Sequence, residues 1–377
     1  MRLCDVCDFQ GGSQPPKNEW SFEQKDGYIR MLQIRDFTQT RNVEKEYIKL
    51  TSSTKTCVTE DILIARYGAS IGKILTGLSG AYNVAIMKTI PNEGILNKSY
   101  LKYYLLSNYF QNGINSVGAR AAQAGFNKED LSKLYIPVVS LVQQKLIVDK
   151  LNKLTTFIGK RKTQLEKLDE LVKSRFIELF GDPMTDVSKW STSTIGEQFN
   201  VTSGGTPATG EKAYWESGTI PWIGSNMCQD TILSENDGKF ITEEGYTHSS
   251  AKWFHKGTVL VALVGATIGK TALLRFDTTT NQNIAAIDVN DNAAFSSEFV
   301  FYHMQMLYSK FMEIGSGKFK MANQGFIRQL PLICPPIELQ NQFAAFVEQT
   351  DKSKFEIKQS LEKLELLKKA LMQKYFG

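Results

Sequence analysis

The order of apolar and polar positions divides the chain into two kinds of segment. Over residues 1–140, short β-branched and aromatic runs alternate with clusters of Gly, Pro, Asn and Ser, and a few helical stretches such as 100–106 intervene. Residues 182–336 repeat this mixture. Because short strands separated by turn residues and interspersed with helices are typical of mixed folds, the pattern predicts an α+β protein with two similar globules.

The segments 141–181 and 337–377 have a helical pattern instead. Apolar residues recur in them at alternating spacings of four and three, which is the pattern of a coiled-coil seam. The first segment contains no Pro and ends at Gly181, Asp182 and Pro183, which terminate a helix. The predicted seam residues are Ile147, Leu151, Leu154, Ile158, Leu165, Leu168, Val172, Leu179, Phe343, Val347, Ile357, Leu361, Leu364 and Leu371.

One such helix cannot bury its apolar stripe alone, so the two helices are expected to pair with each other. A repeat of two related by a pseudo-two-fold axis favours an antiparallel pair and a circular arrangement of the duplicated parts. In the alternative arrangement, each helix covers its own globule. The predicted organisation is a first globule over 1–140, a spacer helix over 141–181, a second globule over 182–336 and a second spacer helix over 337–377.

Repeated strings indicate that the chain is a duplication. GASIGK at 68–73 recurs as GATIGK at 265–270, and each copy follows an apolar, strand-like run. The other matched strings are GGS at 11–13 with GGT at 204–206, residues 83–86 with 283–286, and Gly125-Phe126 with Gly325-Phe326. A colinear series at nearly constant spacing predicts two copies of one structural plan.

The repeated glycine strings do not form a nucleotide-binding loop. A P-loop has four residues between its glycines, whereas both copies here have three. The glycines are therefore expected to form a tight turn, with the Lys side chain at its tip either solvated or in contact with a phosphate. Cys4 and Cys7 lack the second pair that a zinc site requires, and no metal site is predicted.

Residues for catalysis do not occur in matched pairs. His248, His255 and His303 all lie in the second globule, and a duplicated catalytic site would not have its only bases in one copy. No string matches the D/N-P-P-Y/F element with which adenine methyltransferases hold their target base. The sequence indicates recognition rather than catalysis.

Composition limits the classes of protein that the chain can belong to but does not identify a function. The chain has 377 residues, of which 42% are apolar, and a formal net charge of +5, which permits a nucleic-acid partner without requiring one. Its five Cys are scattered, as expected of reduced thiols. The sequence has no apolar run of membrane-spanning length and no secretion-signal pattern at its start, so we expect a cytoplasmic protein without a membrane partner.

The ordered set of motifs resembles the specificity subunit (S, or HsdS) of type I restriction–modification systems. The resemblance rests on the GGS and GGT starts, the GASIGK and GATIGK strings, the Pro-containing exits from the globules, and the long Leu/Lys/Glu helices that end in Phe-Gly. The exit at 334–340 fits the family's P-P-x-x-x-Q pattern, whereas the exit at 136–144 has Val139-Ser140 in place of the Pro pair. The resemblance covers essentially the whole chain.

The resemblance implies a function in DNA recognition. Each globule would be a target-recognition domain that reads one half of a bipartite, asymmetric target in double-stranded DNA. The helices would set the spacer and dock two methyltransferase (M) subunits and the restriction (R) subunits of a complex that defends against phage. The chain would have no catalysis and no cofactor of its own, because S-adenosylmethionine, ATP and Mg²⁺ would belong to its partners.

Two other functions remain open from the sequence alone. The first is a self-sufficient DNA-modifying enzyme, either a methyltransferase or a nuclease, and the second is a helical scaffold that binds only proteins.

Candidate DNA contacts are polar, basic and aromatic residues beside the repeated strings, because Arg, Lys, Asn and Gln supply most contacts to phosphates and bases. We expect residues shared by the two copies to contact phosphates or support the fold, and residues that differ to read bases. The candidates in the first globule are Ser13, Arg30, Arg35, Arg66, Tyr67, Lys73, Arg120 and Gln123. Those in the second are Thr206, Trp222, Ser225, Asn226, Lys270, Asn281, Gln282, Lys318, Asn323 and Gln324.

Overall fold

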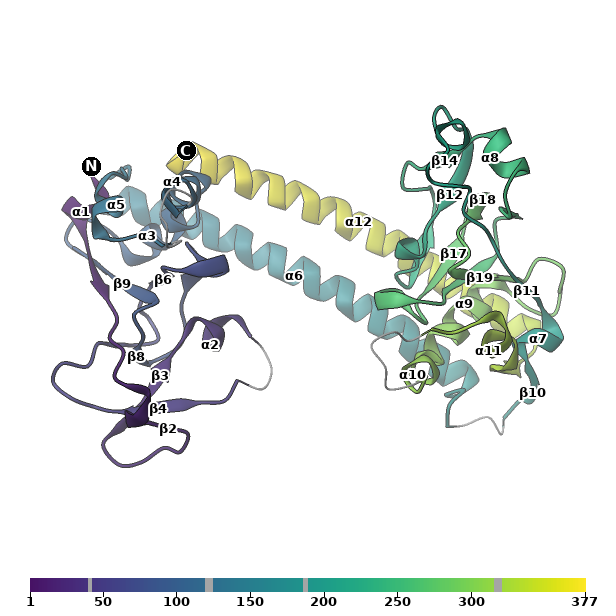
Figure 1. Ribbon diagram of the computed structural model, residues 1–377, viewed down its shortest axis with the longest axis horizontal. Coiled ribbons are helices and arrows are strands. Elements are labelled where there is room, and N and C mark those ends of the chain that lie inside the picture. Colours follow the sequence, from purple (N-terminus) through teal and green to yellow (C-terminus); the bar gives the residue numbers. More distant parts are fainter. Residues whose placement is uncertain (40–42, 119–124, 186–188, 315–320) are drawn as a thin grey trace. The chain divides into compact units, whose positions relative to one another are not determined.

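The computed structural model describes residues 1–39, 43–118, 125–185, 189–314 and 321–377 (Figure 1). Internal contacts divide the chain into a first unit, Met1–Lys162 with Gln359–Gly377, and a second unit, Thr163–Lys358. The unit boundary falls within two helices of 40 residues each, α6 (Leu141–Phe180) and α12 (Ile337–Phe376). In the described part of the chain, no helix combines the length and the apolar character needed to cross a membrane.

The first unit contains two sheets and a group of short helices. The main sheet has the order β1-β9-β6-β7, and the second sheet has the order β2-β4-β3-β8-β5. Their strands are β1 (Cys7–Gly11), β2 (Trp20–Ser21), β3 (Tyr28–Leu32), β4 (Glu46–Lys49), β5 (Thr56–Cys57), β6 (Leu63–Ala65), β7 (Ile74–Leu75), β8 (Gly80–Tyr82) and β9 (Ile86–Pro91). The α-helices besides α6 and α12 are α1 (Leu3–Val6), α2 (Ile34–Thr38), α3 (Lys98–Leu105), α4 (Asn108–Gly118) and α5 (Lys128–Ser132).

The second unit repeats this plan with additions. Its main sheet has the order β11-β19-β16-β17-β13, its second sheet β14-β12-β18-β15, and β10 pairs with β20. The strands are β10 (Ser191–Thr194), β11 (Asn200–Ser203), β12 (Ile220–Ile223), β13 (Thr231–Leu233), β14 (Phe240–Ile241), β15 (Trp253–Phe254), β16 (Val259–Ala262), β17 (Thr271–Leu274), β18 (Thr278–Thr280), β19 (Ile284–Asp288) and β20 (Pro331–Cys334). The short α-helices are α7 (Ile195–Gln198), α8 (Glu243–Thr247), α9 (Ser297–Met306), α10 (Tyr308–Met312) and α11 (Gln324–Gln329).

The shared topology confirms the predicted mixed fold and its internal duplication. In both units the main sheet begins with the same three strands in the same antiparallel order, β1-β9-β6 in one and β11-β19-β16 in the other. In both second sheets a parallel pair lies at the same place, β3 with β8 and β12 with β18.

The structure corrects three of the matches made from the sequence. Gly11 pairs with Met87 where Ser203 pairs with the corresponding Ala285, so the segment 11–13 matches 203–205 rather than 204–206. Gly125 forms a β-bridge with Tyr67, and the equivalent bridge in the second unit joins Val264 to Met321, so Gly125 corresponds to Met321 rather than to Gly325. The Gly325-Phe326 pair lies inside α11 instead. Similarly, the residue that corresponds to Asn83 is Asn281, not Asn283, because both accept a hydrogen bond from the backbone N–H two residues later. Sequence identity at these points was coincidental.

The long helices pack against each other in an antiparallel sense in each unit. In the first unit, Val148 and Leu151 near the start of α6 share a buried cluster with Phe376 at the end of α12. In the second unit, Phe176 near the end of α6 lies 5.4 Å from Phe343 near the start of α12, measured between ring centroids. The predicted seam residues are all buried or half-buried.

Each helix end also covers part of a globule, so the two arrangements considered from the sequence occur together. In Figure 1, α3, α4 and α5 lie beside the ends of the long helices in the first unit, and α9, α10 and α11 lie beside the opposite ends in the second. This contact shifts the buried face at the end of α6. Val172, Phe176 and Phe180 are fully buried, whereas Arg175 and Leu179, which a strict heptad would bury, are half-buried.

A buried glutamine at the start of each long helix fixes the helix to its globule. The Gln144 amide donates to the carbonyls of Ile95 and Val139 (both 2.8 Å), and its Oε1 accepts from Asn97 N–H (2.8 Å). Gln340 makes the equivalent three bonds, to Ala294 O (3.0 Å), Pro335 O (2.9 Å) and Ser296 N–H (2.9 Å).

Both glutamines have no exposed surface. Since a buried amide must be fully hydrogen-bonded, this lock explains why Gln closes both exit motifs even though the Pro pair occurs in only one.

Candidate nucleic-acid interface

Three loops meet at one end of the main sheet in each unit. In the first unit the ends of β1 and β6 lie beside the start of β9, because Gly11 pairs with Met87 and Ala65 pairs with Ile86. In the second unit the corresponding pairs are Ser203 with Ala285 and Ala262 with Ile284. The antiparallel register therefore brings together the repeated GGS/GGT segment, the repeated hairpin and the turn that precedes β9 or β19.

The glycine-rich segment packs directly on the turn before β9 or β19. A Cβ atom on Gly12 would lie 2.1 Å from the carbonyl oxygen of Asn83, and one on Gly204 would lie 2.1 Å from that of Thr280. Only glycine permits this approach of two backbones. In the first unit, hydrogen bonds from Gly12 N–H to Ile86 O (3.0 Å) and from Ser13 N–H to Tyr82 O (3.1 Å) hold the segment in place.

The GASIGK and GATIGK strings form hairpin turns that begin with a short 3₁₀-helix (Gly68–Ser70 and Gly265–Thr267). The first and last glycines have positive φ, 69° and 77° in one copy and 72° and 76° in the other. L-residues rarely adopt these values, which explains the glycines. Lys73 is exposed, and the Nζ of Lys270 lies 3.4 Å from Oε1 of Gln229.

Four of the candidates in the first globule lie at this end of the sheet: Ser13, Arg66, Tyr67 and Lys73. The Arg66 guanidinium is fixed by hydrogen bonds to the carbonyls of Phe126 (3.2 Å) and Val84 (3.3 Å), and it lies 5.0 Å from the centroid of the Tyr67 ring. Such an Arg–aromatic pair presents a positive charge and a flat ring together.

The remaining candidates in the first globule lie elsewhere. Arg30 and Arg35 belong to β3 and α2, where Arg30 pairs with Asp36 (2.6 Å) and Arg35 pairs with Glu46. Their charges are thus already matched by carboxylates. Arg120 and Gln123 are outside the described residues.

In the second globule, Thr206, Lys270, Asn281 and Gln282 lie at the equivalent end. The Thr206 hydroxyl donates to Oε1 of Gln282 (2.6 Å), and Asn281 Oδ1 accepts from Asn283 N–H (3.1 Å). Asn226 is exposed on the 3₁₀-helix Ser225–Met227, which begins with Ser225.

Three other candidates in this globule serve local structure, and one is not described. Trp222 is buried and donates from Nε1 to Gly205 O (3.1 Å). Asn323 caps α11 by accepting from Phe326 N–H (2.8 Å), and Gln324 accepts from Arg328 (3.1 Å) within that helix. Lys318 is outside the described residues.

Sequence reasoning missed Val84, which is 42% exposed at the tip of the turn before β9. The signal was hidden by the wrong alignment of Asn83. With Asn83 matched to Asn281, Val84 corresponds to Gln282.

Two of the three histidines have shifted pKa values with local structural causes. His303 is fully buried in α9, where burial lowers its pKa to about 4 and its Nε2 donates to Pro331 O (2.9 Å). His255 is an exposed partner of Asp277 (3.0 Å), whose hydrogen bond raises the pKa of the imidazole. Among the described residues, no group of three or more His, Cys, Asp or Glu side chains could hold a metal ion.

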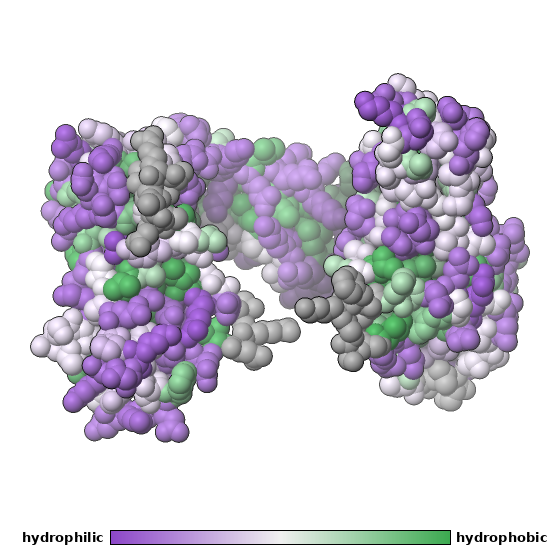
Figure 2. Space-filling model, in the orientation of Figure 1, coloured by the Kyte–Doolittle hydropathy of each residue, from purple (hydrophilic) through white to green (hydrophobic). Residues whose placement is uncertain are grey.

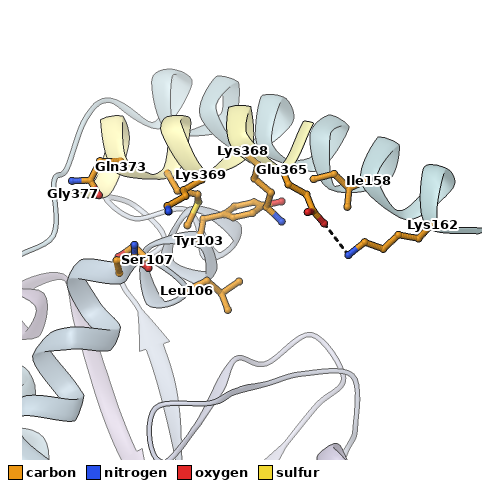
Figure 3. A pocket seen from close by; sticks show the side chains of 12 residues that line it. Tyr103, Leu106, Ser107, Ile158, Lys162, Glu365, Lys368, Lys369, Gln373 and Gly377 are labelled. Carbon is orange, nitrogen blue, oxygen red and sulfur yellow. Dashed lines mark ion pairs between the residues drawn. The ribbon is translucent and has the colours of Figure 1, made fainter. Parts of the chain in front are cut away.

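A cavity of about 450 Å³ opens beside the helices in the first unit (Figure 3). Side chains from α6 and α12 converge on it beside Tyr103, and Lys162 pairs there with Glu365 (3.0 Å). Lys368 also lines the cavity; burial, and then the like charge of Lys162, lower the pKa of its ammonium group. In Figure 2, apolar residues form small groups between hydrophilic ones on the face shown.

Comparison with known proteins identifies the family. The model of the type I restriction modification DNA specificity domain matches residues 1–170 and 187–368. Over 211 residues the chain is 26% identical to the Escherichia coli type I restriction enzyme EcoR124I/EcoR124II specificity subunit, a match that covers 52% of this chain and 49% of the relative. Over 306 residues it is 25% identical to the putative type I restriction enzyme MjaX specificity subunit of Methanocaldococcus jannaschii, covering 75% and 68%. The match thus spans about half the length of the Escherichia coli relative.

Two solved structures share the fold over the whole chain. The S subunit of a type I restriction–modification system from M. genitalium superimposes with a TM-score of 0.59 at 16% identity, covering 100% of this chain and 95% of that one. A chain from a study of assembly and conformational transition in a type I R-M system gives 0.62 at 18% identity, covering 100% and 96%. The family match, which includes most of both globules and most of both long helices, shows that the chain belongs to the type I restriction modification DNA specificity family.

Proposed function

We propose that the chain is the sequence-specific DNA-recognition subunit of a type I restriction–modification complex, acting in the cytoplasm. Its target-recognition domains are 1–140 and 182–336, and each reads one half of a bipartite target. The observation that carries the proposal is the repeated loop end. The same three loops occur on the same strands in both units, but their exposed side chains differ, as Val84 and Gln282 do. Two similar scaffolds with unlike side chains suit an asymmetric DNA sequence.

The long helices serve as spacer and docking surface in this proposal. A helix of 40 residues is about 60 Å long, which exceeds one DNA turn of about 34 Å. Large apolar side chains remain exposed on both helices, among them Val142 and Phe157 on α6 and Phe355 and Leu366 on α12. Such side chains suit contact with two methyltransferase subunits, with restriction subunits joining the complex.

The chemistry is assigned to the partners. S-adenosylmethionine would be held by the methyltransferase subunits, and ATP and Mg²⁺ would serve the assembled complex, so this chain contributes recognition alone. The alternative of a self-sufficient enzyme gains no support from the family or the relatives named above.

The proposal is tested with the purified chain and a type I methyltransferase subunit from the same genome. We expect the chain alone to bind DNA in a salt-dependent manner without methylating or cutting it. Adding the methyltransferase subunit should yield adenine methylation at one bipartite sequence. Methylation by the chain alone would contradict the proposal, as would methylation by the mixture without any sequence preference.

The spacer role has its own test. Inserting one heptad after Gln164 and one after Ser360 lengthens both helices by the same amount. We expect the unspecified spacer of the methylated sequence to lengthen while both half-sites stay the same. Half-sites that change with helix length would refute the spacer role.

A further inference from the structure

The turn before β9 in the first unit and the turn before β19 in the second have the same pattern of backbone hydrogen bonds. In the first unit, Asn83 N–H donates to Leu32 O (3.2 Å) and Arg66 N–H donates to Ala85 O (2.8 Å). In the second, Asn281 N–H donates to Ile223 O (3.1 Å) and Leu263 N–H donates to Asn283 O (2.9 Å).

The side chain of the first turn residue adds a third shared bond, from Ala85 N–H to Asn83 Oδ1 (3.2 Å) and from Asn283 N–H to Asn281 Oδ1 (3.1 Å). Each turn is therefore tied to two neighbouring strands and to itself.

The glycine-rich segment locks the turn from a further side. Gly12 approaches Asn83 O, and Gly204 approaches Thr280 O at the end of β18, so closely that a Cβ atom would clash, and the glycine-rich segment therefore lies directly against the turn or the residue before it. A loop held in this way has little conformational freedom to lose when it binds, and preorganisation of this kind favours precise contacts. The constraint applies to the backbone, while the side chain at the tip stays free to vary.

The tip residue is the one that differs. It is Val84 in the first unit and Gln282 in the second, and both are exposed. Gln282 is further oriented by the Thr206 hydroxyl, which donates to its Oε1 at 2.6 Å. An amide oxygen has two lone pairs, so this bond leaves Oε1 one acceptor site and leaves both donors of Nε2 available.

We propose that the turn tip is a base-reading position in each globule, at which Gln282 recognises adenine and Val84 contacts a thymine methyl group. The inference rests on the proposed function and assigns specificity residues within it. A glutamine amide can accept from adenine N6 and donate to N7 in the major groove, and an apolar side chain packs on the thymine C5-methyl. In the first unit a cation stands beside the tip, because Arg66 donates to the Val84 carbonyl (3.3 Å), and it can contact a phosphate that positions the base.

The test reads the methylated sequences in cells that express the chain with its methyltransferase subunit. Gln282→Val should reduce discrimination at one base pair of the second half-site by roughly 5- to 150-fold and leave the first half-site unchanged. Gln282→Glu keeps the size of the side chain and can still accept from Thr206, but it replaces the donor by an acceptor. It should move the preference at that base pair from adenine toward cytosine. Val84→Gln should alter one base pair of the first half-site only.

Matched controls carry the same changes elsewhere on the globules. Val58→Gln and Gln329→Val alter exposed residues outside the turn and should leave both half-sites unchanged. Three results would overturn the inference: an unchanged sequence in all turn variants, a uniform loss of methylation at every sequence by variants that remain folded, or changes in the wrong half-site.

Failure of the inference differs from failure of the proposed function. If the turn does not read bases, the unmodified chain still directs methylation to a bipartite sequence. If the chain is not a recognition subunit, the unmodified chain directs none. Thermal unfolding of each purified variant identifies any that has lost its fold. In that case Gln282→Ala and Val84→Ala, which only shorten exposed side chains, replace it.

Discussion

The last turns of α6, in the second unit, and of α12, in the first unit, are equivalent but pack differently. In the second unit, Phe176 and Phe180 of α6 meet Phe343 of α12 and Phe299 of α9, with ring centroids between 4.9 and 5.6 Å apart. In the first unit, Met372 takes the place of Phe176, one turn before the final Phe of its helix, and lines the 450 Å³ cavity.

Two turns before that final Phe, the second unit has Val172 and the first has Lys368. Both units bury the final Phe of a long helix against aromatic rings, since Phe376 lies 4.9 Å from Tyr100. The difference lies one and two turns earlier, where the second unit continues the buried face with Phe176 and Val172 and the first has Met372 and Lys368 beside a cavity.

The substitution with the largest expected effect tests this difference between the units directly. Phe176→Ala should destabilise the second unit by about 3–5 kcal/mol, because it leaves a void among side chains that have no exposed surface. Met372→Ala should destabilise the first unit by only about 1–2 kcal/mol, since half-burial beside a cavity offers less contact to lose. Hydrogen exchange resolved by segment measures each unit separately. Equal costs in the two units would show that their helix ends are packed alike.

The glutamine locks should behave alike in both units. Gln144→Leu and Gln340→Leu each remove three hydrogen bonds and leave the backbone partners without a bond. Each substitution should lower the free energy of unfolding by about 3 kcal/mol. Chemical denaturation, monitored by hydrogen exchange in segments of each unit, measures the loss of stability caused by each substitution. A cost confined to one unit would mean that the lock is not a shared requirement of the fold.

Acid should weaken the second unit more than the first through His303. Its folded-state pKa, about 4, lies below the ordinary value of 6.5, so between these values the unfolded chain binds more protons than the folded one. Stability should therefore fall as the pH decreases from about 6.5 to about 4, by up to about 3 kcal/mol. The corresponding residue of α3 is Tyr104, whose pKa burial raises, so it stays neutral throughout this range.

The measurement is thermal unfolding of the wild type and His303→Gln at several pH values. The variant keeps a donor for the Pro331 carbonyl but does not titrate. Its pH dependence should be shallower in this window, whereas parallel curves would exclude His303 as the cause.

The substitution with the smallest expected effect makes the first unit more like the second. Lys368→Val places at this position the residue that occupies it in the other helix. It also removes a partly buried ammonium group whose charge is opposed by Lys162. We expect a gain of about 1 kcal/mol in the free energy of unfolding of the first unit. Denaturant titration checks the sign, and Lys363→Val serves as a matched control at an exposed position of α12 outside the cavity, where no gain is expected.

The sequence was informative where structure repeats at short range. Alternating spacings of four and three identified the long helices, and glycine strings identified hairpins whose positive φ angles require glycine. It missed Phe176 and Phe180 at the end of α6, which are fully buried, whereas the predicted seam residue Leu179 is only half-buried. Packing against α9 sets that face, and a heptad rule includes only the partner helix.

The candidate interface could be predicted only in part, for the same reason. Arg30 and Arg35 are attractive DNA contacts in the sequence, but their pairing with Asp36 and Glu46 depends on how α2 and β4 fold beside them. Val84 carries no signal of its own. Its position becomes visible only when backbone hydrogen bonds show that it shares a turn with Gln282.

Exchange of one globule tests the central claim most directly. Residues 182–336 are replaced by the corresponding segment of a relative with a different target, and the methylated sequences are read in cells that express the complete system. The account predicts that one half-site changes to that of the relative, while the other half-site and the spacer length remain. A change in both half-sites, or in neither, would contradict independent reading by two globules.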